Sequence, residues 1–474
     1  MGNVFGKPFT IHPVLKEVAS IFSNEGKQLY LVGGAVRDSL RGYKAHDWDL
    51  ATDALPEEVI SMFGKRRNKS PKASSSRAEN LPPGCFVVPT GIKHGTVTVH
   101  YKGRIMEVTT FRTESNYSDG RRPDKVEFGA TIEEDLSRRD FTMNAIAYKL
   151  PDGPLVDPFG GKADIKARII RTVGKAEERF SEDGLRPLRA VRFASQLDFK
   201  PDEKLLEAIP AALPLCAQVA SERIRDELDK IINSAKPSIG FLLMEKTGLL
   251  ELLVPELMQC RGIEQKGFHR FDVLDHSLLA LDYAAKNDMP HEVRLASLYH
   301  DLGKPATRKL DEAGHWTFHQ HEKESSRLAR IILLRFKYPR AVIEKVCHLI
   351  EEHMFFYEDN WKDSAVRRFI IRVGEENLND LYKVRQADSF ALAGKESPPD
   401  SLLPLVYRVD AILAEKKALT LKDLAISGND LTTAGISPGK RMGLILKELL
   451  EAVLDDPDLN TREKLLEIAL KLNQ

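Results

Sequence analysis

The chain has 474 residues, which is enough for three or four domains and too many for one compact core. Its 70 basic and 70 acidic residues give a formal net charge of zero, so any surface that binds nucleic acid must be local. Four widely spaced cysteines without a Cys-x-x-Cys pair indicate neither a disulfide framework nor a zinc ribbon. Because the sequence shows no signal peptide and no apolar run long enough to cross a membrane, we expect a soluble, cytoplasmic protein without a membrane partner.

The first predicted elements surround a pair of glycines. The apolar run 29–32 predicts a strand, Gly33 and Gly34 follow it, and residues 36–40 predict a helix. Free backbone N–H groups at the start of such a helix bind phosphate oxygens. An ordinary strand–loop–helix connection is the alternative.

Three carboxylates in the following segments indicate a metal site. Asp47 and Asp49 stand at alternating positions, so their side chains share one face of a strand. Residues 94–111 alternate on both sides of a Lys-Gly turn and predict a β-hairpin, and we expect its strand with Glu107 to pair beside the strand with Asp49. Paired Mg²⁺ ions that act on phosphates need such oxygen ligands. Solvated acidic residues on a turn and a strand are the alternative.

Two further segments combine arginines with acids. Residues 134–145 carry Arg139 and Asp140, and these residue types bind phosphate bidentately and accept hydrogen bonds from a ribose hydroxyl. Residues 182–193 place an arginine at every third position after a Glu-Asp pair, so on a helix these arginines form one slowly drifting stripe. The members of that set are Asp183, Arg186, Arg189 and Arg192. Solvated, salt-bridged helix faces are the alternative.

Read in order, these segments resemble the bacterial class II tRNA nucleotidyltransferases, the CCA-adding enzymes that share a superfamily with bacterial poly(A) polymerases. The resemblance runs almost without a break from Leu31 to Ile231 and rests on GGAVRDSLRG, DWDLAT, MEVTTFRTE, EEDLSRRDFTMNAIAY, RFSEDGLRPLRAVRFASQLDF and SERIRDELDKI. Later stretches, RLASLYHDLGKP and ISGNDLTTAGISPGKRMGLILKELL, resemble the C-terminal half of the same family.

The resemblance implies template-independent addition of CCA to tRNA 3′ ends from CTP and ATP. The acceptor stem and 3′ end of tRNA are then the partner, and no obligate protein partner is implied. Asp47 and Asp49 would bind two Mg²⁺ ions, and Glu107 would help to activate the tRNA 3′-hydroxyl. The implied triphosphate ligands are Gly34 and Arg37, and the implied sugar and phosphate ligands are Arg139 and Asp140. The implied base readers are Asp183 and Arg186, supported by Arg189 and Arg192. An Asp acceptor beside an Arg donor fits cytosine and adenine, whereas guanine and uracil leave polar groups unpaired.

The second half of the chain contains another set of metal-binding residue types. His300 and Asp301 are adjacent within an apolar segment, where neither is stable without a partner. With His276 and Asp388 they resemble the HD phosphohydrolase superfamily, in which a metal activates water. Further imidazoles of the same pattern are His321 and His353. The resemblance implies a second divalent metal and an additional phosphohydrolase activity. A degenerate domain kept for tRNA docking is the alternative.

The predicted fold is α+β, with a small mixed α/β head followed by largely helical domains. We expect a nucleotidyltransferase head over 1–150, a helical neck that recognises the nucleobase over 151–262, an HD domain over 263–396 and a helical tRNA-binding tail over 397–474. The Lys/Arg/Ser/Pro-rich stretch at about 64–84 predicts a disordered insertion in the head, where relatives have a shorter connection.

Enzymes with other activities carry part of these motifs. A poly(A) polymerase, an A-adding enzyme and a CC-adding enzyme all use the same head. The segment 111–124 discriminates among them, and its Arg112, Glu114 and Asp119-Gly120-Arg121-Arg122 run favours full CCA addition over a CC-only enzyme. The intact carboxylates argue against an HD phosphohydrolase with a vestigial head and against a tRNA-binding module without catalysis.

One glycine departs from the expected pattern. Gly184 lies between Asp183 and Arg186, where relatives often have a helix former. Glycine inside a helix costs about 1 kcal/mol relative to alanine. We therefore expect Gly184 to loosen the helix that reads the base.

Overall fold

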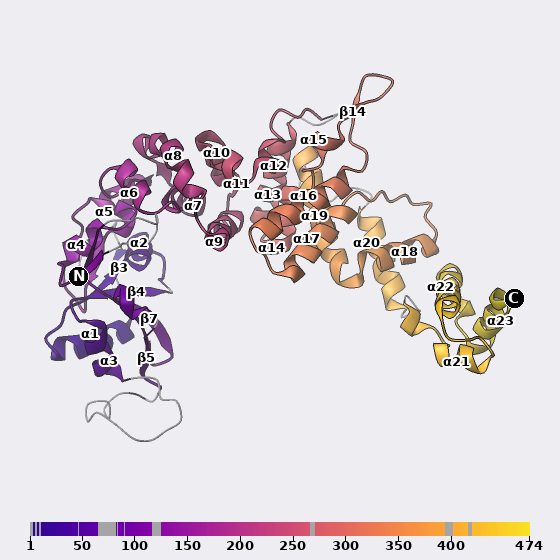
Figure 1. Ribbon diagram of the computed structural model, residues 1–474, viewed down its shortest axis with the longest axis horizontal. Coiled ribbons are helices and arrows are strands. Elements are labelled where there is room, and N and C mark those ends of the chain that lie inside the picture. The colour runs from indigo at the N-terminus through magenta and orange to yellow at the C-terminus, as the bar shows by residue number, and fades with distance from the viewer. Residues whose placement is uncertain are drawn as a thin grey trace. The chain divides into compact units, whose positions relative to one another are not determined.

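The described chain folds into two compact units (Figure 1). The computed structural model describes residues 3–4, 7–8, 11–45, 47–64, 82, 84–89, 91–115, 125–265, 271–393, 402–415 and 420–474. Unit 1 comprises residues 1–231 and 239–253, and unit 2 comprises residues 232–238 and 254–474. The finer division into head, neck, HD domain and tail stays a prediction.

Unit 1 is built around a seven-stranded sheet with the strand order β11-β10-β3-β4-β7-β6-β5. The strands are β3 (Leu29–Val32), β4 (Trp48–Thr52), β5 (Phe86–Val88), β6 (Thr96–Tyr101), β7 (Arg104–Thr110), β10 (Ala147–Lys149) and β11 (Leu155–Val156). Neighbouring strands are antiparallel except β4 and β7, which are parallel. The predicted strand 29–32 and the predicted hairpin, β6 and β7 joined at Lys102 and Gly103, are both confirmed.

Helices pack around this sheet and extend unit 1 beyond it. In the head they are α1 (Pro13–Asn24), α2 (Gly34–Leu40), α3 (Pro56–Phe63) and α4 (Ile132–Ser137), with the 3₁₀ turns η2 (Ile92–His94) and η3 (Thr142–Asn144). After them come α5 (Gly161–Ala167), α6 (Ala176–Glu182), α7 (Arg186–Leu197), α8 (Glu203–Cys216), α9 (Ser221–Ile232), α10 (Ser238–Thr247) and α11 (Leu249–Leu253). Short two-stranded pairs are β1 (Asn3–Val4) with β2 (Lys7–Pro8), β8 (Arg112–Ser115) with β9 (Lys125–Phe128), and β12 (Ile169–Ile170) with β13 (Lys200–Pro201). Helix α2 begins two residues before the predicted helix.

Unit 2 is almost entirely helical. Its helices are α12 (Pro255–Met258), α13 (Val273–Lys286), α14 (His291–Tyr299), α15 (Lys304–Thr307), α16 (His321–Arg335), α17 (Arg340–Glu352), α18 (Asp363–Val373), α19 (Glu375–Ala393), α20 (Leu402–Ala414), α21 (Gly428–Thr433), α22 (Lys440–Asp455) and α23 (Arg462–Asn473). Smaller elements are the strand pair β14 (Lys309–Leu310) and β15 (Trp316–Thr317) and the turns η4 (Leu421–Asp423) and η5 (Pro457–Leu459). Helix α13 packs on α14 and α19. The mixed head and helical remainder confirm the predicted α+β class.

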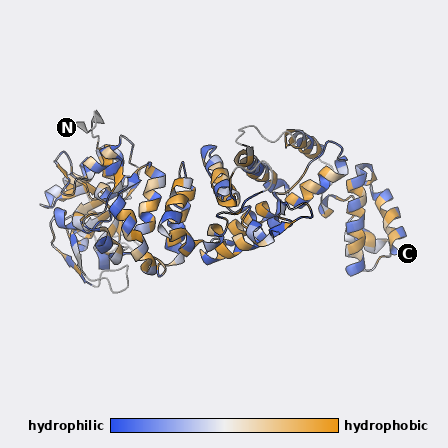
Figure 2. Cartoon of the chain, turned by 90° about the horizontal axis from the view of Figure 1, so that it is seen from above, coloured by the Kyte–Doolittle hydropathy of each residue, from blue (hydrophilic) through white to orange (hydrophobic). Residues whose placement is uncertain are grey.

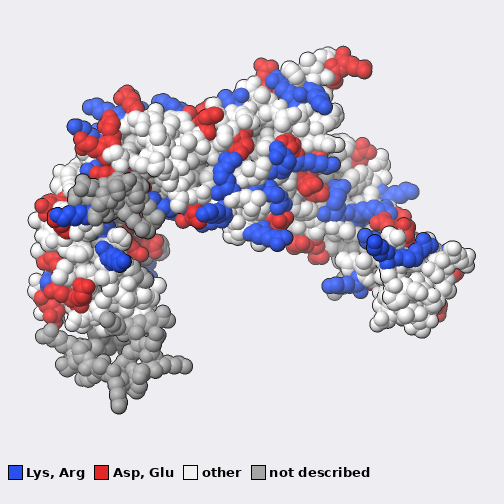
Figure 3. Space-filling view, viewed as in Figure 1, with Lys and Arg blue, Asp and Glu red and all other residues white. Residues whose placement is uncertain are grey.

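The surface and the helix faces agree with the composition. Apolar and polar residues alternate along the helices of both units, as expected for amphipathic helices that bury one face (Figure 2). Basic and acidic side chains are interspersed on the face seen in Figure 3, in keeping with the zero net charge. Among the described helices, none is long and apolar enough to cross a membrane.

Two predicted segments lie largely outside the described residues. The proposed insertion at 64–84 falls mostly on residues 65–81, which the structure does not describe. In the segment 111–124, residues 116–124 and the side chain of Glu114 are likewise outside the description, and Arg112 is described on β8.

Candidate functional site

Two of the predicted carboxylates lie opposite each other on neighbouring strands, and the third stands just before one of these strands. Asp49 on β4 lies directly opposite Glu107 on β7, and Asp47 precedes Asp49 by two residues. The expectation that the Glu107 strand pairs beside the Asp49 strand is therefore confirmed. Desolvation by the surrounding protein raises the pKa of Asp49, the nearby Asp47 raises it further, and Arg139 opposes both. A divalent cation at this position would relieve the repulsion between the two aspartates.

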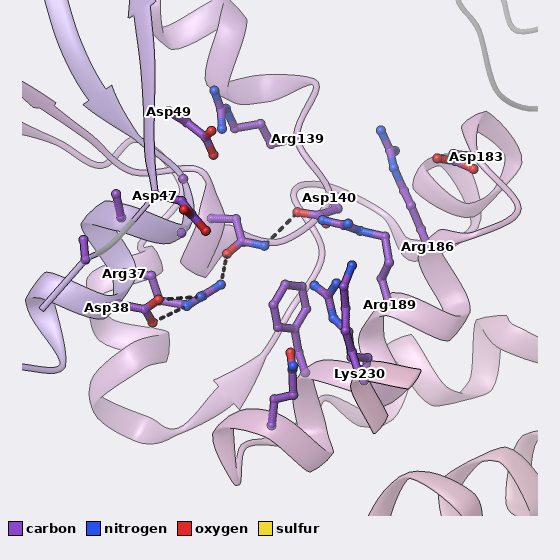
Figure 4. A pocket seen from close by; sticks show the side chains of 18 of the residues that line it. Arg37, Asp38, Asp47, Asp49, Arg139, Asp140, Asp183, Arg186, Arg189 and Lys230 are labelled. Carbon is purple, nitrogen blue, oxygen red and sulfur yellow. Dashed lines mark hydrogen bonds and ion pairs between the residues drawn. The ribbon is translucent and has the colours of Figure 1, made fainter. Parts of the chain in front are cut away.

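A cavity of about 850 Å³ opens beside these aspartates (Figure 4). Its lining comes from the glycine turn, β4, the segment after α4, and helices α7 and α9. Predicted site residues in the lining are Gly34, Arg37, Asp47, Asp49, Arg139, Asp140, Asp183, Arg186, Arg189 and Arg192. Glu107 is the one predicted head residue outside this lining. Cationic side chains dominate the lining, and this suits a ligand with several phosphate oxygens.

The glycine turn keeps space beside Asp49. Gly33 has φ 68°, a conformation that disfavours other residues. A Cβ atom at Gly33 would lie 3.2 Å from Nη1 of Arg139 and 3.7 Å from Oδ2 of Asp49. Arg139 is itself held by Asp135, a fully buried carboxylate that also binds Arg138. The turn thus lets a guanidinium approach the predicted metal ligand closely.

Arg37 and Asp140 belong to one buried network (Figure 4). Arg37 donates to both oxygens of Asp38, at 3.0 and 2.9 Å, and to Asn144 Oδ1 at 2.8 Å. Asp140 accepts from Asn144 Nδ2 at 3.0 Å, from the Phe141 amide at 2.8 Å, and from Nε and Nη2 of Arg189, the former at 2.8 Å. Burial opposes ionisation of Asp140, but Arg189 and Asn144 outweigh it and lower its pKa.

These contacts use the whole acceptor capacity of Asp140. An ionised carboxylate has about four lone-pair sites. Each oxygen of Asp140 already receives two donors. A ribose hydroxyl at Asp140 would therefore have to displace one of these donors, so the predicted sugar contact requires a rearrangement.

The two predicted base readers are joined by a backbone hydrogen bond, from the Arg186 amide to the Asp183 carbonyl at 3.0 Å, but their side chains bond to other residues. Asp183 accepts from Arg223 at 2.8 Å and from the Leu185 amide at 3.0 Å. Arg186 pairs with Glu182 and donates to the carbonyl of Arg138 at 3.0 Å. In this state, the acceptor and the donor predicted for the base are each occupied by protein groups.

The turn before α7 explains the unusual glycine. Gly184 lies between α6 and α7 and not inside a helix, so the prediction that it loosens a helix is wrong. A Cβ atom at Gly184 would lie 2.6 Å from the carbonyl oxygen of Leu215 on α8. Glycine is needed here because the backbones approach closely, next to Asp183.

Arg192 lies deeper than its neighbours in the stripe. It pairs with Glu227 of α9 at 3.0 Å, and its guanidinium lies 4.0 Å from the centre of the Phe193 ring. Burial lowers its pKa to about 10, against the attraction of Glu227. The side chains of Arg192 and Glu227 are 8% and 4% exposed, so the pair is part of the core beneath the cavity.

The structure adds lining residues that the sequence reasoning did not single out. Asn144, Arg223 and Lys230 line the cavity, and the first two bond directly to predicted site residues. Asn144 and Arg223 lie inside the matching stretches EEDLSRRDFTMNAIAY and SERIRDELDKI, but no spacing rule distinguishes them there. Their contacts with the predicted site residues depend on the packing of α9 and η3 against α7 and α2.

The His-Asp set of unit 2 converges in the helical core. His276 Nε2 lies 3.1 Å from Asp388 Oδ1 and 3.2 Å from His300 Nε2. Asp301 lies 3.3 Å from His300 and 3.2 Å from His321. Two groups have all their ligand atoms within 4.8 Å of one another, namely His276 with His300 and Asp388, and His300 with Asp301 and His353. Within the described part of the chain these are the only such groups, and the head carboxylates do not form one.

The donors of this cluster fit a divalent metal ion. Burial opposes protonation of His300, but Asp301 and Asp388 raise its pKa to about 10. Burial and the neighbouring His300 lower the pKa of His353 to about 3. The two carboxylates therefore favour positive charge at this position, which a divalent cation would supply in place of a proton on His300. Imidazole nitrogens with carboxylate oxygens are the ligands that Mn²⁺, Zn²⁺ and Fe²⁺ accept, and all but Asp388 are almost fully buried.

Three protein-family models match the chain. The "Poly A polymerase head domain" matches residues 29–171, and the "Probable RNA and SrmB- binding site of polymerase A" matches residues 198–260. A model for tRNA nucleotidyltransferase domain 2 matches residues 311–469.

Relatives match over nearly the whole length. A CCA-adding enzyme of Lactobacillus johnsonii is 35% identical over 461 residues, which cover 94% of this chain and 92% of that protein. A CCA-adding enzyme of Geobacillus stearothermophilus is 45% identical over 224 residues, covering 47% of this chain and 50% of that protein. The crystal structure of the Bacillus stearothermophilus CCA-adding enzyme in complex with CTP superposes with a TM-score of 0.70 at 30% identity, covering 98% of each chain.

Proposed function

The chain belongs to the CCA-adding enzymes, which are tRNA nucleotidyltransferases, and we propose that its head cavity adds C, C and A to tRNA 3′ ends from CTP and ATP. One observation carries the proposal: the parallel register of β4 and β7 sets Asp49, which lines the arginine-rich cavity, opposite Glu107. Nucleotidyl transfer needs carboxylates for Mg²⁺ and cations for the triphosphate, and both occur here.

In this proposal the three carboxylates have different roles. Asp47 and Asp49 hold Mg²⁺, which when bound neutralises charge that develops on the phosphates. Glu107 helps to activate the tRNA 3′-hydroxyl as the attacking group. Mg²⁺ is usually bound by one or two carboxylates together with water and substrate phosphates. The head carboxylates therefore need no closed cage before the nucleotide arrives, in contrast to the cluster of unit 2.

The cations and the base readers complete the site. Gly34 and Arg37 hold the triphosphate, and Arg139 lies beside the metal ligands. Asp183 and Arg186 exchange their present protein partners for the Watson–Crick edge of the base. Cytosine and adenine offer this pair a donor and an acceptor, whereas guanine and uracil leave a buried polar group unpaired at a cost of about 1–3 kcal/mol. The supporting residues are Arg189, Arg192 and Asp140.

The decisive assay uses three tRNA transcripts. One lacks the whole tail, one ends after the second C, and one carries complete CCA. Each is incubated with Mg²⁺ and with CTP and ATP, separately and together, and the products are sequenced. We expect two C and one A to be added in order, followed by arrest. Long A tracts would identify a poly(A) polymerase instead, and products that stop after CC or that gain only A would identify a partial enzyme.

A second activity is proposed for unit 2. The convergence of His276, His300, Asp301 and Asp388 supports a metal-dependent phosphohydrolase of the HD type, with His321 and His353 as further ligands. Lys304, whose Nζ lies 2.6 Å from Asp301, offers a cation for a substrate phosphate. Hydrolysis of bis(p-nitrophenyl) phosphate should appear when Mn²⁺ or Ni²⁺ is added and vanish with chelator. If neither metal binds to the purified protein, unit 2 serves only tRNA docking.

A further inference from the structure

Asn144 connects the two halves of the proposed nucleotide site. It ends η3, is 6% exposed and lines the cavity. Its Oδ1 accepts from Arg37 Nη1 at 2.8 Å and its Nδ2 donates to Asp140 Oδ1 at 3.0 Å. A guanidinium only donates and a carboxylate only accepts, so the orientation of the amide is fixed by its partners. Both hydrogen bonds are buried.

The two neighbours of Asn144 connect it to different elements of the cavity lining. On one side Arg37 is held by Asp38, and both belong to α2 in the head. On the other side Asp140 binds Arg189 of α7. The resulting series of side chains is Asp38, Arg37, Asn144, Asp140 and Arg189, and Figure 4 shows the bonds on both sides of the central amide.

Resting on the proposed function, we propose that Asn144 is a positioning residue that couples triphosphate binding at Arg37 to nucleoside binding at Asp140 and Arg189. A triphosphate that binds to Arg37 alters the hydrogen bond between Arg37 and Asn144. The same amide holds Asp140, the carboxylate that orients Arg189. Asn144 itself has no role in the chemistry of transfer.

Neither aspartate nor leucine fits both neighbours at this position. Aspartate would keep the acceptor for Arg37 but would place a carboxylate against Asp140, at the 3.0 Å now bridged by a hydrogen bond. Leucine, of similar size, would leave a donor of Arg37 and a lone pair of Asp140 without this partner in a buried place. The two substitutions therefore break different parts of the series, and this makes the proposal testable.

The test measures binding of CTP and of inorganic tripolyphosphate to the whole protein with Mg²⁺ by calorimetry. Tripolyphosphate reports the phosphate half alone. Because it carries at least as much negative charge as CTP, the extra charge of an aspartate repels it at least as strongly, so a larger loss for CTP cannot come from charge alone. We expect Asn144→Leu to weaken both ligands about tenfold. We expect Asn144→Asp to weaken CTP at least tenfold more than tripolyphosphate. Asn24→Asp, an exposed change of the same kind on α1, should alter neither.

Several outcomes would overturn the proposal. One is that Asn144→Asp weakens both ligands by the same factor, which would show that Asn144 has no separate effect on the nucleoside half of the site. Another is that both Asn144 variants bind CTP within twofold of the wild type. Wild-type protein that binds CTP but adds none to tRNA would contradict the proposed function while leaving this binding test intact.

A double-mutant cycle tests the coupling without changing Asn144, in case its variants fail to fold. Asp38→Asn and Arg189→Lys are combined, and CTP affinity is measured for each single and for the pair. Changes at independent sites multiply. We expect a departure of at least threefold from the product of the single effects, and a simple product would overturn the coupling. Since Arg37 and Arg189 both lie over the ring of Phe193, the cycle is repeated with Phe193→Leu, where the coupling should persist.

Discussion

The head cavity and the His-Asp cluster both gather charge, but they balance it differently. Around the cavity of about 850 Å³, acidic and basic side chains form ion pairs, some of them between different elements, as Asp183 does with Arg223. In the cluster, imidazoles and carboxylates converge to within 4.8 Å of one another. The paired charges around a large space support the proposal of a nucleotide site, and the close convergence of donors supports the proposal of a metal site.

The largest expected effect comes from a substitution in the head, and it tests whether the two sites act separately. Asp49→Ala removes a proposed metal ligand, and we expect nucleotide addition to fall by roughly 10³-fold, because metal stabilisation of the transition state supplies several kcal/mol. Incorporation of labelled CMP into tRNA measures it. Asp152→Ala, which removes an exposed partner of Lys16, is the matched control. Retention of more than a tenth of the activity would remove Asp49 from the catalytic set.

The reciprocal change tests the cluster. His300→Ala removes a donor shared by both candidate ligand groups, so we expect loss of bound Mn²⁺ and about a 10²-fold or greater loss of phosphodiester hydrolysis, with nucleotide addition within twofold of the wild type. Metal content of the purified protein and both assays measure this. His315→Ala, on an exposed side chain, is the control. Parallel loss of both activities would contradict the separation of the two sites.

A buried pair beneath the cavity tests whether its charges also serve stability. Glu227→Gln leaves Arg192 without its carboxylate in a place where both side chains are almost fully buried. Removing one partner of such a pair costs about 3–5 kcal/mol. Urea unfolding followed by circular dichroism measures the loss. Glu178→Gln, in an exposed pair with Lys175, should change the unfolding free energy by less than about 0.5 kcal/mol. Equal small effects would mean that solvent reaches Arg192.

The smallest effect concerns the turn before α7. Gly184→Ala drives a Cβ atom against the Leu215 carbonyl and must shift backbone. We expect a stability loss of about 1–3 kcal/mol and CTP binding that weakens by less than tenfold, because Asp183 moves with the turn. Gly443→Ala on α22, where a Cβ meets nothing within 4 Å, should instead stabilise the protein. An unchanged melting temperature for Gly184→Ala would show that the turn yields without cost.

In the head, the residues that could be predicted from the sequence are those whose type suits one kind of chemistry, such as carboxylates for a metal ion. The strand signal located Asp49 and the hairpin pattern located Glu107, so their opposite positions on β4 and β7 followed from local signals, whereas Asp47 lies immediately before β4. The full order of the sheet did not follow, because the short strands β10 and β11 carry no pattern that separates them from loops. The residues of the His-Asp cluster were predictable by type, but their convergence required the packing of α13, α14, α16, α17 and α19.

The hydrogen-bond partners of the site residues could not be predicted from the sequence. No local pattern indicates that Asp183 binds Arg223, which is 40 residues away. Asn144 bonds to Arg37 across 107 residues. Such pairs depend on how α9 and η3 pack against α7 and α2, and periodicity describes single elements only.

The parallel pairing of β4 and β7 has a consequence for tolerance to insertions. Two parallel neighbours need a crossover connection, and here it contains α3, β5, η2 and β6 and includes residues 65–81. Closing a chain loop costs free energy only with the logarithm of its length, so doubling a loop adds about 0.6 kcal/mol. Extra residues in this crossover therefore change the free energy of pairing the Asp49 and Glu107 strands only slightly. The length of this connection can vary between relatives while the carboxylates stay opposite each other.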